Sequence, residues 1–111
     1  MSVRLKSEEV NAVNGKVLYS LTGNEYVSKR LSLKVCNLSD SSPVGVGYAL
    51  VSVDDDILSG VPTANWVVYN ENLDPTSDQK GVNNIEFDVV ITDGQQLVVR
   101  STAPANFNLF G

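Results

Sequence analysis

Residues 84–101, with the sequence NIEFDVVITDGQQLVVRS, decide the fold class of this chain. From Ile85 to Val89 large apolar residues alternate with acidic ones, and this period of two is typical of a strand with one buried face. Asp93-Gly94 separates that run from a second apolar run at 95–101. Because an Asp-Gly pair between two alternating runs favours a tight turn, the stretch predicts a β-hairpin.

The rest of the chain repeats this pattern of short, valine-rich runs between turn-forming residues. No stretch has the periodicity of an amphipathic helix. The predicted strands cover residues 15–21, 26–38, 44–53, 64–73, 84–91, 95–101 and 106–110. About seven strands at regular spacing predict an all-β fold, a single antiparallel β-sandwich or jelly-roll-like domain at 15–111 that follows a short N-terminal arm at 1–14.

A length of 111 residues allows one domain with one hydrophobic core. With 42% hydrophobic and 19% charged residues, the composition is that of a globular domain rather than a disordered segment. The predicted core takes the apolar face of each run and consists of Val17, Tyr19, Leu31, Leu33, Val35, Val46, Tyr48, Leu50, Trp66, Val68, Ile85, Phe87, Val89, Leu97 and Val99.

Charge and residue types exclude several functions. The net charge of -5 disfavours binding to nucleic acid or to an anionic membrane, because an acidic surface repels phosphate. The absence of histidine removes Ser-His and Cys-His nucleophile pairs, a histidine general base and histidine metal sites. The single cysteine, Cys36, cannot form an internal disulfide and is expected to be a half-buried strand residue. We therefore expect no enzyme, no cofactor and no metal site.

Two groups of carboxylates are candidates for chemistry. Asp54-Asp55-Asp56 offers the oxygen ligands that calcium prefers, but EF-hand spacing is absent and neighbouring side chains of an extended loop point apart. Glu86 and Asp88 share one face of a predicted strand, as the acid and base of a glycoside hydrolase would. The sequence favours a solvated loop for the first group and the polar face of a strand for the second, and leaves calcium binding open.

The expected arm at 1–14 is the first candidate surface for partners. Val3 and Leu5 lie two residues apart, so an extended arm places both on one face, beside the basic Arg4 and Lys6. Such a segment can add as a strand to the open sheet edge of a neighbour. A disordered tail is the alternative, because the arm has too few apolar residues to fold alone.

The second candidate surface lies on the strand at 44–53, where Gly45, Gly47 and Ala49 alternate with larger apolar residues. A face of small residues permits the close approach of another backbone. Because the opposite face already supplies the core, we expect these three residues to contact a second copy of the chain.

Four segments carry a likeness to a known group of proteins. Lys16–Leu21 is followed by a short turn, and Leu31–Leu38 is followed by a small polar turn and an alternating strand. Trp66–Tyr69 supplies an aromatic strand, and Asp93–Ser101, with a terminal Phe-Gly, supplies a closing hairpin. Over about residues 15–111 the chain resembles a small β domain of tailed-bacteriophage virion structural proteins, the head-decoration and head- or tail-associated accessory proteins.

The resemblance implies a noncatalytic, multi-copy virion component that binds other virion proteins, either as a capsid decoration or cement protein or as a head- or tail-associated accessory protein. It also favours a homo-oligomer, with a trimer as the preferred state. We expect assembly into the virion in the host cytoplasm, since the N-terminal residues lack the apolar run of a signal peptide and no apolar run is long enough for a membrane helix. The alternative is a carbohydrate- or host-receptor-binding module of a phage appendage that uses Trp66, Tyr69 and the acidic loops.

Overall fold

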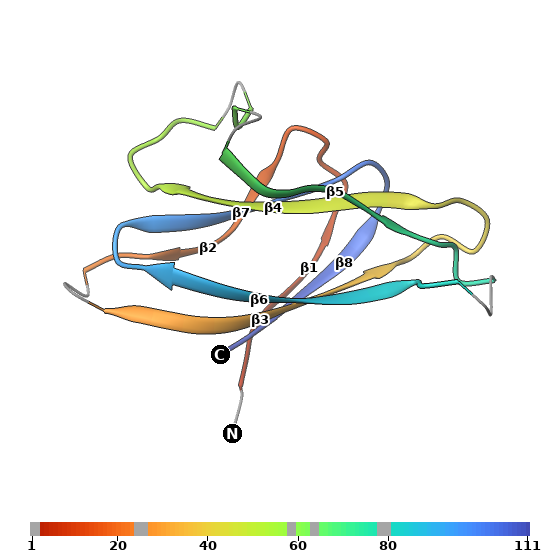
Figure 1. Ribbon diagram of the computed structural model, residues 1–111, viewed down its shortest axis with the longest axis horizontal. Coiled ribbons are helices and arrows are strands. Elements are labelled where there is room, and N and C mark those ends of the chain that lie inside the picture. Colours follow the sequence, from red (N-terminus) through yellow and green to blue (C-terminus); the bar gives the residue numbers. More distant parts are fainter. Residues whose placement is uncertain (1–2, 24–26, 58–59, 63–64, 78–80) are drawn as a thin grey trace.

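A computed structural model describes residues 3–23, 27–57, 60–62, 65–77 and 81–111 of the chain. These residues form eight strands in two four-stranded antiparallel sheets that pack face to face (Figure 1). The strands are β1 (Arg4–Val10), β2 (Lys16–Leu21), β3 (Ser28–Asn37), β4 (Val44–Ser52), β5 (Trp66–Leu73), β6 (Asn84–Thr92), β7 (Gln95–Ser101) and β8 (Ala105–Phe110). This architecture confirms the predicted antiparallel β-sandwich. Two residues of the predicted strands, Tyr26 and Ala64, lie outside the described part of the chain.

The order of the strands is that of a jelly roll. One sheet has the order β1-β8-β3-β6 and the other has the order β2-β7-β4-β5. Early strands therefore pair with late ones, β1 with β8, β2 with β7, β3 with β6, and β4 with β5. A long antiparallel ribbon that is rolled across itself gives this nested pairing. As a result, consecutive strands lie in different sheets, except for β4 and β5.

The turn at Asp93-Gly94 connects the two sheets and does not form the predicted hairpin. It joins β6 in one sheet to β7 in the other. Gly94 has a φ of 87° and donates its N–H to Leu21 O at 2.7 Å, while Asp93 donates its N–H to Val27 O at 3.0 Å. The hairpin prediction is wrong because β7 is buried on both faces and lies between two neighbours, β2 and β4.

Residues 4–10 of the expected arm form β1, which is part of the sandwich. β1 pairs with β8 along its length, and beyond it Val3 and Gly111 exchange both backbone hydrogen bonds, at 2.8 and 2.9 Å. This pairing corrects the expectation of a free arm and raises the strand count from about seven to eight. The alternation that would have marked the strand is missing because its first four residues are exposed and Val10 alone is fully buried.

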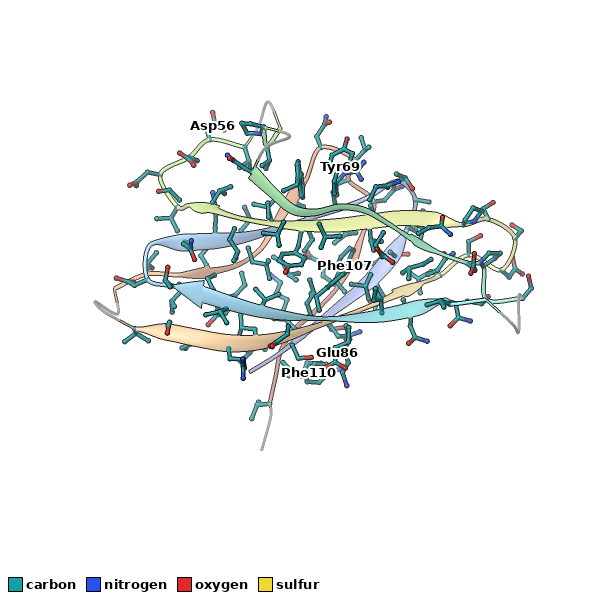
Figure 2. All side chains as sticks on the ribbon, viewed as in Figure 1. Asp56, Tyr69, Glu86, Phe107 and Phe110 are labelled. Carbon is teal, nitrogen blue, oxygen red and sulfur yellow. The ribbon has the colours of Figure 1, made fainter. Side chains whose placement is uncertain are left out.

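The core lies between the sheets, with Phe107 of β8 as its largest fully buried side chain (Figure 2). Its buried residues are Val10, Leu18, Leu21, Leu31, Leu33, Val35, Val44, Val46, Tyr48, Leu73, Val89, Ile91, Leu97, Val99, Ala105, Phe107 and Leu109. On β2 the prediction missed the buried Leu18, while of the two predicted residues the half-buried Tyr19 packs against this core and the half-buried Val17 packs against a second cluster. The pairing of β2 with β7 shifts between Val17 and Tyr19, and this bulge breaks the simple alternation of faces.

Candidate functional site

The face of β4 that carries the small residues Gly45, Gly47 and Ala49 is buried inside the molecule. A Cβ atom on Gly47 would overlap the backbone carbonyl oxygens of residues 68 and 69, and one on Gly45 would overlap the side-chain amide of Asn70. Ala49 is also fully buried. These three residues make room for β5 of the same chain, which corrects the expectation that they contact a second copy.

A bulge brings β5 this close to β4. Between the Val46–Glu71 and Tyr48–Val68 pairs, two residues of β5 lie opposite the single Gly47. Two residues opposite one define a β-bulge, which leaves a residue unpaired and bends the strand. Glycine at position 47 is required because any side chain there would collide with the bulged backbone.

The outer face of the β2-β7-β4-β5 sheet carries a second, smaller apolar cluster. It consists of buried Ala49, Val51 and Val98, with Val17, Ile57, Val61 and Trp66 packed against it. The Trp66 indole Nε1–H donates to Val61 O at 3.3 Å, which ties the start of β5 to the connection that follows β4. This sheet is therefore covered on its outside, over parts of β4 and β7, by the protein's own chain.

Arg100, on β7, holds the bulge of β5 in place. Its side chain is nearly fully buried, with 3% exposure. Nε donates to Val13 O at 3.0 Å, and Nη1 donates to Tyr69 O at 2.7 Å and to Asn70 Oδ1 at 3.2 Å. No described carboxylate forms an ion pair with it, so three oxygen acceptors and the Tyr69 ring stabilise the charge. The sequence signal for this residue was a cation directly after the apolar run Leu97–Val99.

Trp66 and Tyr69 form one aromatic pair, with edge-to-face rings whose centroids are 6.0 Å apart. Trp66 is half-buried over the second cluster, so its ring acts in packing. Tyr69 is 50% exposed, and the Arg100 guanidinium lies against one face of its ring. Of the two aromatic residues in the carbohydrate hypothesis, Tyr69 is therefore the accessible one, and Figure 2 shows it on the covered side of the sandwich.

The outer face of the β1-β8-β3-β6 sheet is polar, and no described loop crosses it (Figure 1). We call the outward side chains of β3, β6 and β8 the bare face. The register aligns Glu86, Lys34 and Asn108 in one cross-strand row, and Asn84, Cys36 and Asn106 in the next. A shallow depression of about 400 Å³ lies over these rows. Its lining residues are Lys34, Val35, Cys36, Asn84, Ile85, Glu86 and Asn108.

Side chains of the bare face contact one another across the strands. Lys34 Nζ lies 5.1 Å from the centroid of the Phe110 ring. Ser32 Oγ donates to Glu86 Oε1 at 2.5 Å, and Arg30 lies 3.5 Å from Asp88. The two candidate acid–base carboxylates are thus each engaged by a different residue of β3.

The other predicted partner residues, Val3–Lys6, gather at one end of β1. Val3 and Leu5 are 59% and 42% exposed, and Val3 pairs through its backbone with Gly111 after β8. Leu5 borders a groove of about 270 Å³ together with Lys29, Arg30, Leu31 and Gly111. The structure thus brings these four residues together at the surface and separates them from the buried face of β4.

The described residues offer neither a metal-binding cluster nor a membrane-spanning helix. They contain no group of three or more histidine, cysteine, aspartate or glutamate side chains that could hold a metal ion, and no helix long and apolar enough to cross a membrane.

In the acidic loop, the N–H groups of Asp54 and Asp55 bond to Ser52 Oγ and Ser52 O, at 3.2 and 3.0 Å. This local turn ends β4.

No protein-family model, no curated protein sequence and no solved structure matches this chain.

Proposed function

We propose that this protein is a noncatalytic structural protein that acts in many copies through protein–protein contacts in the virion of a tailed bacteriophage. It serves there as a capsid decoration or cement protein, or as a head- or tail-associated accessory protein, and its partners are other virion proteins. The likeness of its strand segments to such proteins supports this function. The jelly roll adds fold-level analogy, because viral capsid proteins share this architecture with lectins.

The observation that carries the proposal is the contrast between the two outer faces of the sandwich. One sheet is covered by the second apolar cluster and by the connection after β4. The other sheet presents the bare face, with aligned rows of amide and charged side chains around a half-buried Phe110. An uncovered, nearly regular sheet of this kind suits contact with the surface of a neighbouring protein, in which a polar rim surrounds a few apolar contacts.

The chemistry of the described residues supports a noncatalytic role. The chain has no histidine, so Cys36 and the serines have no imidazole base. Glu86 and Asp88 are exposed and bond to Ser32 and Arg30. The carboxyl group that acts as the acid of a glycosidase lies in an apolar pocket, whereas Glu86 and Asp88 lie on an exposed strand face.

The second candidate function is binding of a carbohydrate or a host receptor. The exposed Tyr69 ring favours it, because Arg100 fixes one face of the ring and leaves the remainder available for stacking on a sugar. A glycan array with the wild type and Tyr69→Ala tests this function. Binding that Tyr69→Ala abolishes, while Tyr19→Phe retains it, would favour this candidate over a purely structural role.

The test of the main proposal is detection of the protein in particles. Virions purified from a culture that expresses this chain should contain it in many copies, by quantitative immunoblotting and by immunogold labelling. Asn108→Arg, at the centre of the bare face, should reduce incorporation, whereas Asn72→Arg, on exposed β5, should not. Particles that lack the protein would contradict the proposal. Equal incorporation of both variants would show that the bare face is not the surface that contacts the virion.

A further inference from the structure

β1 has an open backbone edge. It is the outermost strand of its sheet, with β8 on one side and no described strand on the other. At its C-terminal end, Val10 O accepts a hydrogen bond from Ser101 Oγ at 2.7 Å, so the open part of the edge covers residues 4–9. An unpaired edge offers its N–H and C=O groups to another strand.

The three other edge strands are protected against pairing with themselves. β5 carries two register shifts, and such bulges disrupt a regular edge. β2 carries one shift, as β1 does, but its only charged residue is Lys16, so two copies of β2 have no opposite charges to place together. β6 is regular, but its outer face presents Glu86 and Asp88. Two copies of β6 would place acidic side chains opposite one another, which is unfavourable. This leaves β1 as the edge best suited to a second copy.

The charges of β1 complement themselves in an antiparallel pair. Arg4 and Lys6 lie in its first half, and Glu8 and Glu9 lie in its second half. When two copies pair with Ser7 opposite Ser7, Lys6 lies opposite Glu8 of the other copy. Lys6 and Glu8 are on the same face of the sheet, since their β8 partners Leu109 and Phe107 both point inward. Opposite charges at such positions stabilise strand pairs.

The bulge of β1 brings the second pair of charges together in the same register. The pairing with β8 shifts between Arg4 and Lys6, so Leu5 is an extra residue. Without the bulge, a pair centred on Ser7 would place Arg4 opposite Val10 of the other copy. With Leu5 as an extra residue, Arg4 lies opposite Glu9 of the other copy instead. Arg4 and Glu9 both lie on the outer face, as their β8 partners do. The Lys6–Glu8 and Arg4–Glu9 pairs of opposite charge therefore form in the same register. The two-fold axis gives each pair twice in the dimer.

We propose that β1 pairs antiparallel with β1 of a second copy about a two-fold axis at Ser7, which joins two sheets into one continuous sheet across a dimer. Such a contact is self-complementary and closes after two copies. It also brings Lys6 of the second copy toward Glu8, whose Oε1 binds Lys16 Nζ at 2.8 Å and whose Oε2 has no partner among the described residues. This pairing does not depend on the proposed function, and it yields a dimer rather than the trimer that the phage resemblance favours.

Sedimentation equilibrium of the full chain tests the pairing. The wild type should shift with concentration from 12.0 kDa to twice that mass. Arg4→Glu and Glu9→Arg each place like charges at both symmetric pairs and should raise the dissociation constant about tenfold. An equimolar mixture of these two variants should recover the dimer, because every Arg4–Glu9 position is then occupied by opposite charges. Glu71→Arg, the matched control on exposed β5, should leave the dimer unchanged.

A cysteine crosslink locates the axis. In a Cys36→Ser background, Ser7→Cys should form a covalent dimer under mild oxidation, since residue 7 faces its own copy, whereas Ser20→Cys on exposed β2 should not. Circular dichroism and melting curves establish that each variant is folded. A wild type that stays monomeric at about millimolar concentration, a trimer mass, or a dimer that neither charge reversal weakens would overturn the proposal.

Discussion

The guanidinium carbon of Arg100 lies 4.2 Å from the centroid of the Tyr69 ring. The same guanidinium donates to the carbonyl oxygen of Tyr69 and to the side chain of Asn70, so one buried cation contacts the ring, the backbone and the neighbouring amide of the β5 bulge. Because β7 and β5 both flank β4, Arg100 reaches across β4 to fix an edge strand. Its partner on β4 is Gly47, where a Cβ atom would overlap the carbonyl oxygens of Val68 and Tyr69.

Arg100→Ala should therefore lower the free energy of unfolding by about 3 kcal/mol, since it removes three part-buried hydrogen bonds of a buried cation together with its contact on the Tyr69 ring. Arg100→Lys should recover part of this loss, because an ammonium group can bond to one or two of the acceptors but lacks the planar stack on Tyr69. Urea denaturation measures both. Arg30→Ala removes an exposed ion pair with Asp88 and should change the stability by less than about 0.5 kcal/mol. Equal losses for Arg100→Ala and Arg30→Ala would refute the structural role of Arg100.

Gly47→Ala should destabilise the fold by about 3 kcal/mol or more, because the new methyl group overlaps backbone oxygens that cannot move without opening the β5 bulge. The matched control is Gly23→Ala. Gly23 has a φ of 76° and open space where a Cβ atom would lie, so its cost is conformational and should be about 1 kcal/mol. Thermal melting of both variants gives the comparison, and a smaller loss at position 47 than at position 23 would contradict the assigned collision.

Asn37→Ala should also be strongly destabilising. The buried Asn37 Nδ2 donates to Ser42 O at 2.9 Å, to Asp74 O at 3.1 Å and to Leu73 O at 3.3 Å, and Oδ1 accepts from Ser39 N at 2.9 Å. Loss of this amide should cost about 2 kcal/mol, since several loop groups lose their partner. Asn37→Asp should cost more, because a buried carboxylate then faces carbonyl oxygens.

The exposed Asn84→Ala and Asn84→Asp are the matched controls for these two variants, and chemical denaturation should show small effects for both. If Asn37→Asp were as stable as the wild type, the donor role assigned to the Asn37 amide would be wrong.

The stability should fall at alkaline pH because of Tyr48. Burial, and secondarily the charge of Asp88, raise the pKa of the Tyr48 hydroxyl above its ordinary value of 10.0. Below that pH the hydroxyl is protonated in both the folded and the unfolded chain. Above it the unfolded chain releases the proton first, so the free energy of unfolding falls as the pH rises. Denaturation curves from pH 9 to 11 should show a shallower decline for Tyr48→Phe than for the wild type.

Tyr69→Phe removes a hydroxyl from an exposed ring and serves as the control for this pH series. A decline in Tyr48→Phe as steep as in the wild type would show that other groups cause it.

The sequence predicted seven of the eight strands because each of those seven has an apolar run with turn formers on both sides. It missed β1, whose stability comes from pairing with a strand at the far end of the chain rather than from its own apolar pattern. It also misassigned Asp93-Gly94, since a tight turn has the same sequence whether it links two paired strands or crosses between sheets. Local composition does not contain that distinction.

The sequence also predicted the candidate surfaces only in part. Gly47 correctly indicated close approach of another backbone, whereas Gly45 makes room for the Asn70 side chain, and both neighbours belong to β5 of the same chain. Their sequence could not identify the source of that strand, because a bulge depends on the register of two strands and leaves no fixed motif. Arg4 and Lys6 lie at the surface as expected, although they lie on a paired strand.

The strand order has a consequence for how the protein is made. β7 and β8 lie in the interior of the two sheets, yet they are the last of the eight described strands to be synthesised. Until residues 95–110 have emerged, β1 and β2 have no partner strand, and neither sheet can close. The nascent chain therefore cannot complete this core strand by strand, and folding must bring distant segments together once β7 and β8 have been synthesised. Such long-range closure is slow, which makes the newly made chain dependent on remaining soluble before it folds.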